Sequence, residues 1–572
     1  MIWYNDNLVI MELSFSIKQS TLNKGRELLL RNPQSWLVVL AALLATGVSI
    51  WSIWTGYAIA YGDSESHLNI AKRVVDSLSP GFAQLGGIWL PLPHVLMLPF
   101  VVFDPLWRSG AAGAIVSGLA FVISVLYIYK LTLLLIEKKS AGIVAALVFM
   151  ANPNILYMQS TPMSELVLIC FFVLSTYFFI RFLKRDNDLL SLLLAGLFGF
   201  LATLSRYDGW FLVMIEAFVV GLVYFPWKQV PRRLSQFRLL FDKQKWQNLE
   251  GKLILYCTLA FFGILLWLLW DWLILGDPLY FLHSEFSAGT QQAEWRSRGA
   301  LPAYHNLWLA FLYYFTTAMS NIGVFVTGIA ITGLVMFSRK QQDSQKWFVL
   351  LVLMVPFIFN VLTLFLGQSV IFIPHLTKNF EWNLFNVRYG LLMVPAAALL
   401  VGYAFYRSKM AGRLLLIALC MGQIGLFVIG YSKVIDYADG VSGLSSAISK
   451  LPSVQGWIKT NYDGGLVLVD DYARTMSIIR SGIPMDKVIY IGNRGYWDDS
   501  LKAPEKYARW IVMQKNDMLW KQLYDDLGMR GRVYKYFEKA YTSPDILVFK
   551  RTDKATEPGD EIPSTIPELV KK

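Results

Sequence analysis

Long apolar segments constrain this chain more than any other feature. Eleven such runs lie between residues 36 and 431, and few charges interrupt them. A helix needs about 17–25 apolar residues to cross a bilayer, where every backbone polar group must be satisfied inside the segment. The runs are 36–60, 109–136, 141–158, 164–183, 189–205, 208–226, 253–275, 306–337 (one long or two broken pieces), 347–370, 386–405 and 412–431. The pattern predicts a mainly α, polytopic membrane bundle of about eleven spans over residues 36–431.

Charged residues become more frequent after this region. Asp, Glu, Lys and Arg make up 16% of the 572 residues, whereas a soluble protein carries about 25%. The last 141 residues alone hold 21 basic and 19 acidic residues, which is the charge content of a soluble segment. We therefore expect a small α/β domain at 432–551, followed by a disordered polar tail at 552–572. The expected strands are 466–469, 488–491, 510–513 and 546–549, and the expected helices are 473–480 and 518–527.

The loops between the apolar runs carry different charges on the two sides. The side that includes residues 1–35 has 23 basic and 9 acidic residues, and the other side has 8 basic and 10 acidic residues before the tail. Basic loops stay in the cytoplasm. We therefore expect a multi-pass protein of the plasma membrane with a cytoplasmic N-terminal segment and an extracytoplasmic C-terminal domain. The net charge of +12 has the same explanation, so membrane lipids and not nucleic acid are the expected partners.

The first outer loop, residues 61–108, carries acidic and histidine side chains directly after the first span. Asp63, Glu65 and His67 alternate with serine there. Either carboxylate could act as a general base, and the three side chains together offer mixed oxygen and nitrogen ligands for a divalent cation. The alternative is a helix start, with Asp63 as N-cap and Glu65 favoured in the first turn by the helix dipole.

Two arginines are expected at the outer ends of spans, Arg206 and Arg388. The planar guanidinium fork binds phosphate in a bidentate manner, so both are candidates for holding a lipid phosphate. The alternative is that they reach along the apolar surface to the headgroups, as long basic side chains often do.

Four further residues on the same outer side are candidates for substrate contact. Glu165 follows Thr161-Pro162, so it either complements a helix dipole or contacts substrate. Asp208 either pairs with the neighbouring Arg206 or hydrogen-bonds substrate, and we expect the pair. His94 and His375 could bind phosphate or a metal ion, although a single loop histidine usually does neither.

The order of these motifs resembles the GT-C superfamily of membrane glycosyltransferases, in particular its protein O-mannosyltransferases and aminoarabinose transferases. Those enzymes carry an Asp-Glu type motif after the first span and then a Pro-Pro-Leu-like element. The corresponding segments here are Asp63-Ser64-Glu65, Trp89-Leu90-Pro91-Leu92-Pro93-His94, Asn152-Pro153, Met163-Ser164-Glu165, Ser205-Arg206-Tyr207-Asp208-Gly209-Trp210 and Arg388-Tyr389. The inserted Ser64 departs from the Asp-Glu pair and leaves open which carboxylate acts.

The resemblance implies a polyprenyl-phosphate sugar as donor and an inverting transfer on the outer face to an acceptor glycan, lipid or protein. We expect Asp63 as the base, with Glu65 assisting or binding a metal ion. Metal dependence stays open because the relatives differ, and no organic cofactor is expected. Two other functions remain open. A transporter or flippase of lipid-linked glycans would use Asp63 and Arg206 to coordinate cargo, and a non-catalytic subunit of a glycan-assembly complex would not need Asp63.

Overall fold

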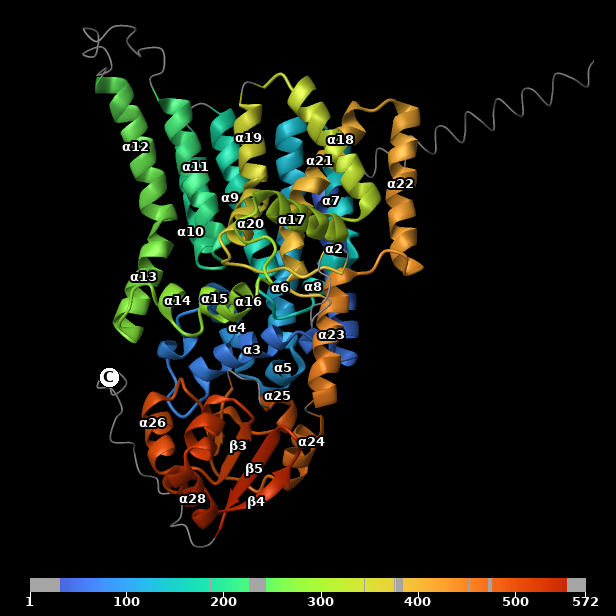
Figure 1. The fold of residues 1–572 in the computed structure, drawn as a ribbon. Coiled ribbons are helices and arrows are strands. Elements are labelled where there is room, and N and C mark those ends of the chain that lie inside the picture. The colour runs from blue at the N-terminus through green and yellow to red at the C-terminus, as the bar shows by residue number, and fades with distance from the viewer. Residues whose placement is uncertain are drawn as a thin grey trace, which may run out of the picture.

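The computed structural model describes residues 31–185, 188–225, 243–343, 345–374, 376, 384–450, 452–471 and 476–552. Most of the expected N-terminal segment and nearly all of the expected disordered tail lie outside these residues. Within them the chain forms a helical bundle with a mixed five-stranded sheet at one end (Figure 1). A layer of short helices separates the bundle from the sheet (Figure 1).

The bundle contains helices that are long and apolar enough to cross a membrane. Five continuous helical segments satisfy both conditions in the described residues, and three bent helix pairs raise the number to eight. The five are α2 (Pro33–Trp54), α6 (Ala111–Ile136), α9 (Glu165–Lys184), η5 with α21 (Val387–Met393 and Val394–Arg407) and α22 (Met410–Val428). The pairs are α12 with α13 (Lys243–Ala260 and Phe262–Leu275), α17 with α18 (Leu307–Ile322 and Val324–Lys340) and α19 with α20 (Lys346–Leu353 and Val355–Phe365). A multi-pass membrane protein is thereby confirmed.

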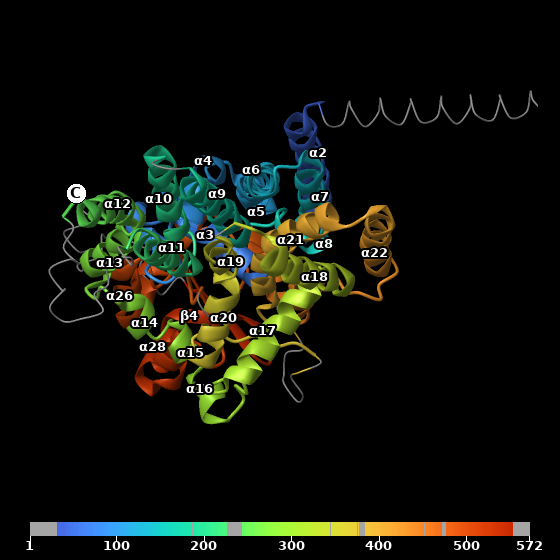
Figure 2. The same ribbon diagram turned by 90° about the horizontal axis from the view of Figure 1, so that it is seen from above.

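The count of eleven spans stays a prediction, because several expected spans form shorter helices. These are α7 (Lys139–Met150), α10 (Leu189–Thr203) and α11 (Asp208–Tyr224). The helix α22 packs at the edge of the bundle (Figure 2). An apolar groove separates it from α2, α7 and α21.

Several expected spans are broken, and the sequence explains the breaks. The run 141–158 is divided into α7 and α8 (Pro153–Met158), because the Asn152 side chain accepts hydrogen bonds from the Asn154 and Ile155 amides and starts a new helix at Pro153. Helices α17 and α18 meet at 111° at Gly323, whose φ of 95° suits glycine. The pairs around Phe261 and Met354 bend by 42° and 49°, so the expected spans 253–275 and 347–370 are each divided into two helices.

The first outer loop supplies most of the layer between bundle and sheet. It forms α3 (Gly62–Val75), α4 (Leu92–Val101) and α5 (Asp104–Ser109), and the prolines of the 91–93 segment start α4. Three short helices join the same layer (Figure 1). They are α14 (Tyr280–His283), α15 (Ala288–Gln291) and α16 (Ala293–Ser297).

The C-terminal sheet has the strand order β2-β1-β3-β5-β4. Its strands are β1 (Val467–Val469), β2 (Val488–Ile489), β3 (Trp510–Gln514), β4 (Phe537–Thr542) and β5 (Ile546–Arg551). The first three are parallel, and β5 is antiparallel to both β3 and β4. All four expected strands are present. The edge strand β4 was not predicted, because only Phe537 of its six residues is buried and its apolar residues do not form a run.

The helices around the sheet differ more from expectation. Of the expected helix 473–480 only the end lies in a described helix, α25 (Ile478–Ser481), and the expected 518–527 is a short π-helix (Trp520–Asp525) followed by α28 (Leu527–Tyr536). The other helices of this part are α23 (Ile435–Lys450), α24 (Pro452–Asn461), α26 (Arg494–Lys502) and α27 (Pro504–Tyr507).

The sheet packs directly on the first outer loop. Leu68, Met97 and Trp107 of that loop share one hydrophobic core with Val469 and Val512 of the sheet. Polar contacts reinforce this packing. Arg73 pairs with Asp471, the Tyr490 hydroxyl donates to Gln84, and Arg108 donates to the carbonyls of Ile479 and Ile483. The first loop and the sheet are therefore one packed unit.

Candidate active site

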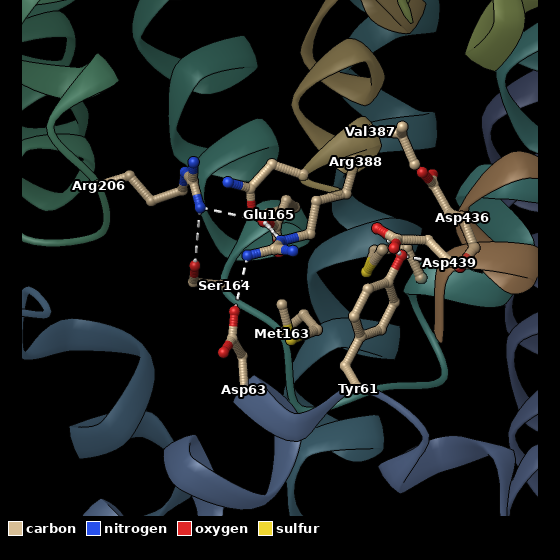
Figure 3. A network of polar contacts seen from close by, with 12 residues as sticks. Tyr61, Asp63, Met163, Ser164, Glu165, Arg206, Val387, Arg388, Asp436 and Asp439 are labelled. Atoms are coloured by element: carbon tan, nitrogen blue, oxygen red, sulfur yellow. Dashed lines mark hydrogen bonds and ion pairs between the residues drawn. The ribbon is translucent and has the colours of Figure 1, made fainter. Parts of the chain in front are cut away.

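Four charged residues from four separate segments meet where the bundle touches the first loop (Figure 3). Asp63 comes from α3, Glu165 from α9, Arg206 from the turn between α10 and α11, and Arg388 from η5. Arg388 donates from Nη2 to Asp63 Oδ2 at 2.7 Å and from Nε to Glu165 Oε1 at 3.0 Å. Arg206 Nη1 donates to the same Glu165 oxygen at 3.0 Å. Glu165 thus links the two guanidinium groups.

Glu165 is completely buried at the first turn of α9. The preceding turn is fixed against α6, because the Ser117 hydroxyl donates to the Thr161 carbonyl at 2.8 Å. An acid at a helix N-terminus is stabilised by the helix dipole. The expected dipole role of Glu165 is therefore compatible with its contact with two arginines. A buried carboxylate needs such partners, since burying an unpaired charge is very costly.

Arg206 lies in a tight turn between α10 and α11. A Cβ atom at Gly209 would lie 2.2 Å from the Ala202 carbonyl oxygen, so the close return of the chain requires glycine there. Arg206 Nε donates to Asp208 Oδ2 at 3.3 Å, which is the expected local pair. The second oxygen of Asp208 accepts a hydrogen bond from Asn360 at 3.3 Å. Asp208 therefore orients Arg206 from the start of α11.

Arg388 is held between acids and aromatic rings. Its guanidinium carbon lies 5.4 Å from the centre of the Tyr61 ring and 5.5 Å from that of Tyr389, within the range of cation–π attraction. The η5 backbone is anchored by Asn321, whose amide donates to the Val387 carbonyl at 2.8 Å. The Arg388 side chain is 9% exposed, so it is part of the site and does not reach out to lipid headgroups.

The network is rich in charge relative to its size. It contains three carboxylates, of Asp63, Glu165 and Asp208, and two guanidinium groups, so its formal charge is −1 when all are ionised. Each guanidinium has five N–H donors, and these contacts use two nitrogen atoms of each. The arrangement can orient a carboxylate as a proton acceptor and still offer N–H donors to an anion.

Glu65 does not join this network. Its carboxylate accepts hydrogen bonds from the Ser477 hydroxyl at 2.6 Å and the Ile479 amide at 3.2 Å. Both partners belong to the segment at α25, on the side of the sheet. The structure therefore separates Glu65 from Asp63, although only one residue lies between them.

The two histidines of the first loop form a buried pair of their own. His67 Nδ1 lies 2.8 Å from His94 Nε2, and the His67 ring packs 4.6 Å from that of Trp89. Burial lowers the pKa of His67 to about 4, with Asp63 opposing this shift. Burial also lowers the pKa of His94, and the neighbouring His67 adds to the effect. Both rings are consequently neutral at pH 7.

The expected metal set of Asp63, Glu65 and His67 is not assembled. Among the residues that the structure describes, no three His, Cys, Asp or Glu side chains are placed to hold a metal ion. The reason is the divergence of Glu65, which leaves Asp63 with an arginine. His375 lies outside the described residues.

Three residues near the network were not predicted from the sequence. The Tyr61 hydroxyl donates to the Asp436 carbonyl at 2.7 Å and to Asp439 Oδ2 at 3.4 Å (Figure 3). Both aspartates belong to α23, directly after the last span. The spacing could have indicated a shared contact, because aspartates three residues apart lie on one face of a helix. The segment was predicted to belong to the C-terminal domain because its composition is that of a soluble protein, and no link to the site was expected.

Comparison with known proteins gives one family match and several similar folds. The profile of the dolichyl-phosphate-mannose-protein mannosyltransferase family matches residues 102–238. A comparison with curated sequences gives no match. The fold is similar to that of ArnT from Cupriavidus metallidurans bound to undecaprenyl phosphate, with a TM-score of 0.56, 11% identity, and coverage of 90% of this chain and 99% of that chain. The apo state of ArnT gives a TM-score of 0.53 with the same identity and coverage.

A third solved structure, the Archaeoglobus fulgidus oligosaccharyltransferase in the apo form, gives a TM-score of 0.45 at 13% identity over 93% of this chain and 75% of that chain. The resemblance to the GT-C superfamily that the sequence predicted is confirmed by the family profile and by the ArnT-like fold.

Proposed function

We propose that this protein is an integral membrane glycosyltransferase that moves a sugar from a polyprenyl-phosphate donor to an acceptor on the outer face of the membrane. The observation that carries the proposal is the placement of Asp63 against Arg388, within a network that adds Glu165 and Arg206. The ArnT-like fold supports it, since that relative was solved with undecaprenyl phosphate bound. The match to a mannosyltransferase family supports transfer of a sugar.

Asp63 is the general base in this proposal. An acceptor hydroxyl oxygen attacks the anomeric carbon of the sugar, and its proton passes to the Asp63 carboxylate. The bond between the anomeric carbon and the phosphate oxygen breaks, and its electron pair stays on the leaving lipid phosphate. Attack from the face opposite the phosphate inverts the configuration at the anomeric carbon.

The two arginines have different tasks in this scheme. Arg388 is nearly buried and bonded to Asp63, so it orients that carboxylate towards the acceptor. Arg206 is 18% exposed, twice the exposure of Arg388, and is better placed to meet an incoming phosphate. Preorganised N–H donors at the leaving oxygen stabilise the charge that develops there. Arg388 adds its remaining donors once the phosphate has entered.

The other candidate residues hold the arginines and the helix α3 in place. Glu165 sets the spacing between Arg206 and Arg388, and Asp208 orients Arg206. The pair of His67 and His94 joins α3, which carries Asp63, to α4. Glu65 attaches α3 to the sheet. We assign it this structural task in place of the assisting or metal-binding one.

The test is to incubate the purified protein with a labelled polyprenyl-phosphate sugar and a membrane extract as acceptor source, and to measure free polyprenyl phosphate. The wild type should release it, and Asp63→Asn should not. A flippase in proteoliposomes would move the labelled lipid between leaflets without releasing the phosphate. A non-catalytic subunit would do neither, and equal release by both proteins would refute the role of Asp63.

A further inference from the structure

The helix α23 follows the last span and returns to the charged network before the chain enters the sheet (Figures 1 and 3). The Asp436 amide donates to the Asn154 side-chain oxygen at 3.1 Å, and the Asp436 carbonyl accepts from the Tyr61 hydroxyl. The same hydroxyl reaches Asp439 Oδ2 at 3.4 Å. This helix is therefore tied to both the bundle and the first loop.

The approach of α23 is unusually close and depends on a glycine. A Cβ atom at Gly440 would lie 2.6 Å from the Tyr157 hydroxyl and 3.1 Å from the Tyr61 ring. Any larger residue would push the helix away from these rings. The contact thus places the neighbouring Asp439 carboxylate at the edge of the site, where it is 8% exposed.

Arg388 lies on the other side of this contact. Its guanidinium packs on the Tyr61 ring, whose hydroxyl bonds to Asp439 (Figure 3). Asp439 also lies close enough to Arg388 for the guanidinium charge to lower the pKa of its carboxyl group. The Asp439 carboxylate thereby contacts the hydroxyl of the ring on which the Arg388 guanidinium packs.

We propose that Asp439 is a positioning residue, which together with the Tyr61 hydroxyl fixes the orientation of Arg388 and, through Arg388, that of Asp63. The effect of Asp439 on turnover rests on the proposed function. Its effect on the orientation of the Arg388 side chain does not. The segment beyond the last span is then part of the site and more than a connection to the sheet.

The two aspartates of α23 contact their neighbours through different groups, which provides a matched control: Asp439 through its carboxylate and Asp436 through its backbone. Burial raises the pKa of Asp439 only to about 6, because the Arg388 charge, the Tyr61 hydroxyl and the Val387 backbone oppose it. Burial and the charge of Asp439 raise the pKa of Asp436 well above its usual value. Asp439 is therefore mostly ionised at pH 7. The ionisable groups that face them are Tyr61, Asp63, Tyr157, Glu165 and Arg388.

The experiment compares Asp439→Asn with Asp436→Asn in the full-length protein. Asp439→Asn should lower kcat roughly tenfold or more with an unchanged KM for the donor, because a misplaced catalytic group slows chemistry without weakening binding. It should also remove the acidic limb near pH 6 from the pH profile of kcat. Asp436→Asn keeps the shape of the side chain and the backbone groups that contact Tyr61 and Asn154, so kcat and its pH profile should stay as in the wild type.

A second measurement does not need turnover. A dicarbonyl reagent that modifies arginine should label Arg388 slowly in the wild type and in Asp436→Asn, and faster in Asp439→Asn. Mass spectrometry of the peptide that contains residue 388 gives the rates. Tyr61→Phe keeps the ring and every charge, and it should also speed the labelling.

These outcomes separate the two proposals. Equal labelling of Arg388 in the wild type, Asp439→Asn and Tyr61→Phe would overturn the positioning role, even if turnover had fallen. If Asp439→Asn does not fold, the Tyr61→Phe variant decides alone. If the wild type releases no polyprenyl phosphate, the proposed function fails, and the labelling still tests the position of Arg388.

Discussion

Asp63 and Glu65 lie two positions apart on α3, and their carboxylates bind opposite parts of the molecule. Asp63 accepts from Arg388 at 2.7 Å, whereas Glu65 accepts from Ser477 at 2.6 Å. Two residues on an α-helix are separated by about 200° of rotation, so neighbouring acids in an Asp-x-Glu motif face opposite sides. One short motif therefore supplies both a site carboxylate and an anchor for the sheet.

Asp63→Asn is expected to keep the fold and donor binding and to lower turnover at least about 100-fold, the lower range for a lost general base. The amide still accepts a hydrogen bond from Arg388 but cannot take the acceptor proton. Release of polyprenyl phosphate measures turnover, and titration with donor measures binding. Wild-type turnover in this variant would reduce Asp63 to a helix-start residue.

Glu65→Gln is the matched control on the same helix. It weakens the contact with Ser477 and Ile479 and leaves the Asp63 pair in place. A hydrogen bond to a charged group contributes about 1.5–3 kcal/mol, so we expect a lower unfolding temperature and a smaller loss of turnover than in Asp63→Asn. A deeper loss of turnover for Glu65→Gln than for Asp63→Asn would assign the base to Glu65.

Arg206→Lys and Arg388→Lys should each reduce kcat/KM although the charge is kept. A lysine ammonium cannot bind two acceptors in the plane of a guanidinium fork. The loss of one charged hydrogen bond, about 1.5–3 kcal/mol, corresponds to roughly 10–150-fold. Because both arginines bind the same Glu165 oxygen, the double variant should lose less than the sum of the single losses. Additive losses would show that the arginines act independently, and near-normal values for both single variants would remove them from the site.

Much of the fold was predictable because the bilayer imposes one strong requirement on the sequence. Apolar length identified the membrane helices, and alternation of short β-rich runs identified four strands of the sheet. The break within 306–337 was one of two alternatives from the sequence, whereas those at Asn152 and Met354 were not foreseen, since a kinked pair keeps the same hydropathy as a straight span. The strand β4 lies at the edge of the sheet, and its apolar residues do not form a run. It was therefore not recognised as a strand.

The site was predictable only in part, for a similar reason. Asp63, Glu165, Arg206 and Arg388 were identified because charges at the ends of apolar runs stand out. The partner of each one was not visible, because hydrogen bonds such as that between Arg388 and Asp63 join residues 325 positions apart. The aspartates of α23 were missed since they lie in a segment of soluble composition, where acids are common.

The position of the sheet relative to the membrane gives a further prediction. The loops on the side of residues 1–35 carry 23 basic residues, against 8 on the other side before the tail. The region 432–572 should therefore be extracytoplasmic. A protease added to spheroplasts should remove this region and spare a tag inserted near residue 240. Protection of the C-terminal region together with cleavage of the tag would reverse the orientation.

The buried His67 predicts how stability depends on pH. Its pKa is about 4 in the folded protein and about 6.5 in an unfolded chain, so the folded state disfavours the protonated ring. The stability that follows from this difference is present above pH 6.5 and is lost as the pH falls towards 4. A difference of this size corresponds to about 3 kcal/mol.

His67→Asn removes the ionisable ring and should flatten this part of the pH dependence. Unfolding temperatures in detergent at pH 7.5, 6 and 5 measure it, with the wild type falling more steeply than the variant. His94→Asn is the comparison variant. Its ring is also buried, so it should make a separate contribution to the fall of the unfolding temperature with pH. Carboxylates titrate in the same pH range in every variant. The contribution of His67 is therefore the difference in unfolding temperature between the wild type and the variant at each pH. Parallel curves for the wild type and His67→Asn would mean that the ring is solvated, and the packing of His67 against His94 and Trp89 would then be wrong.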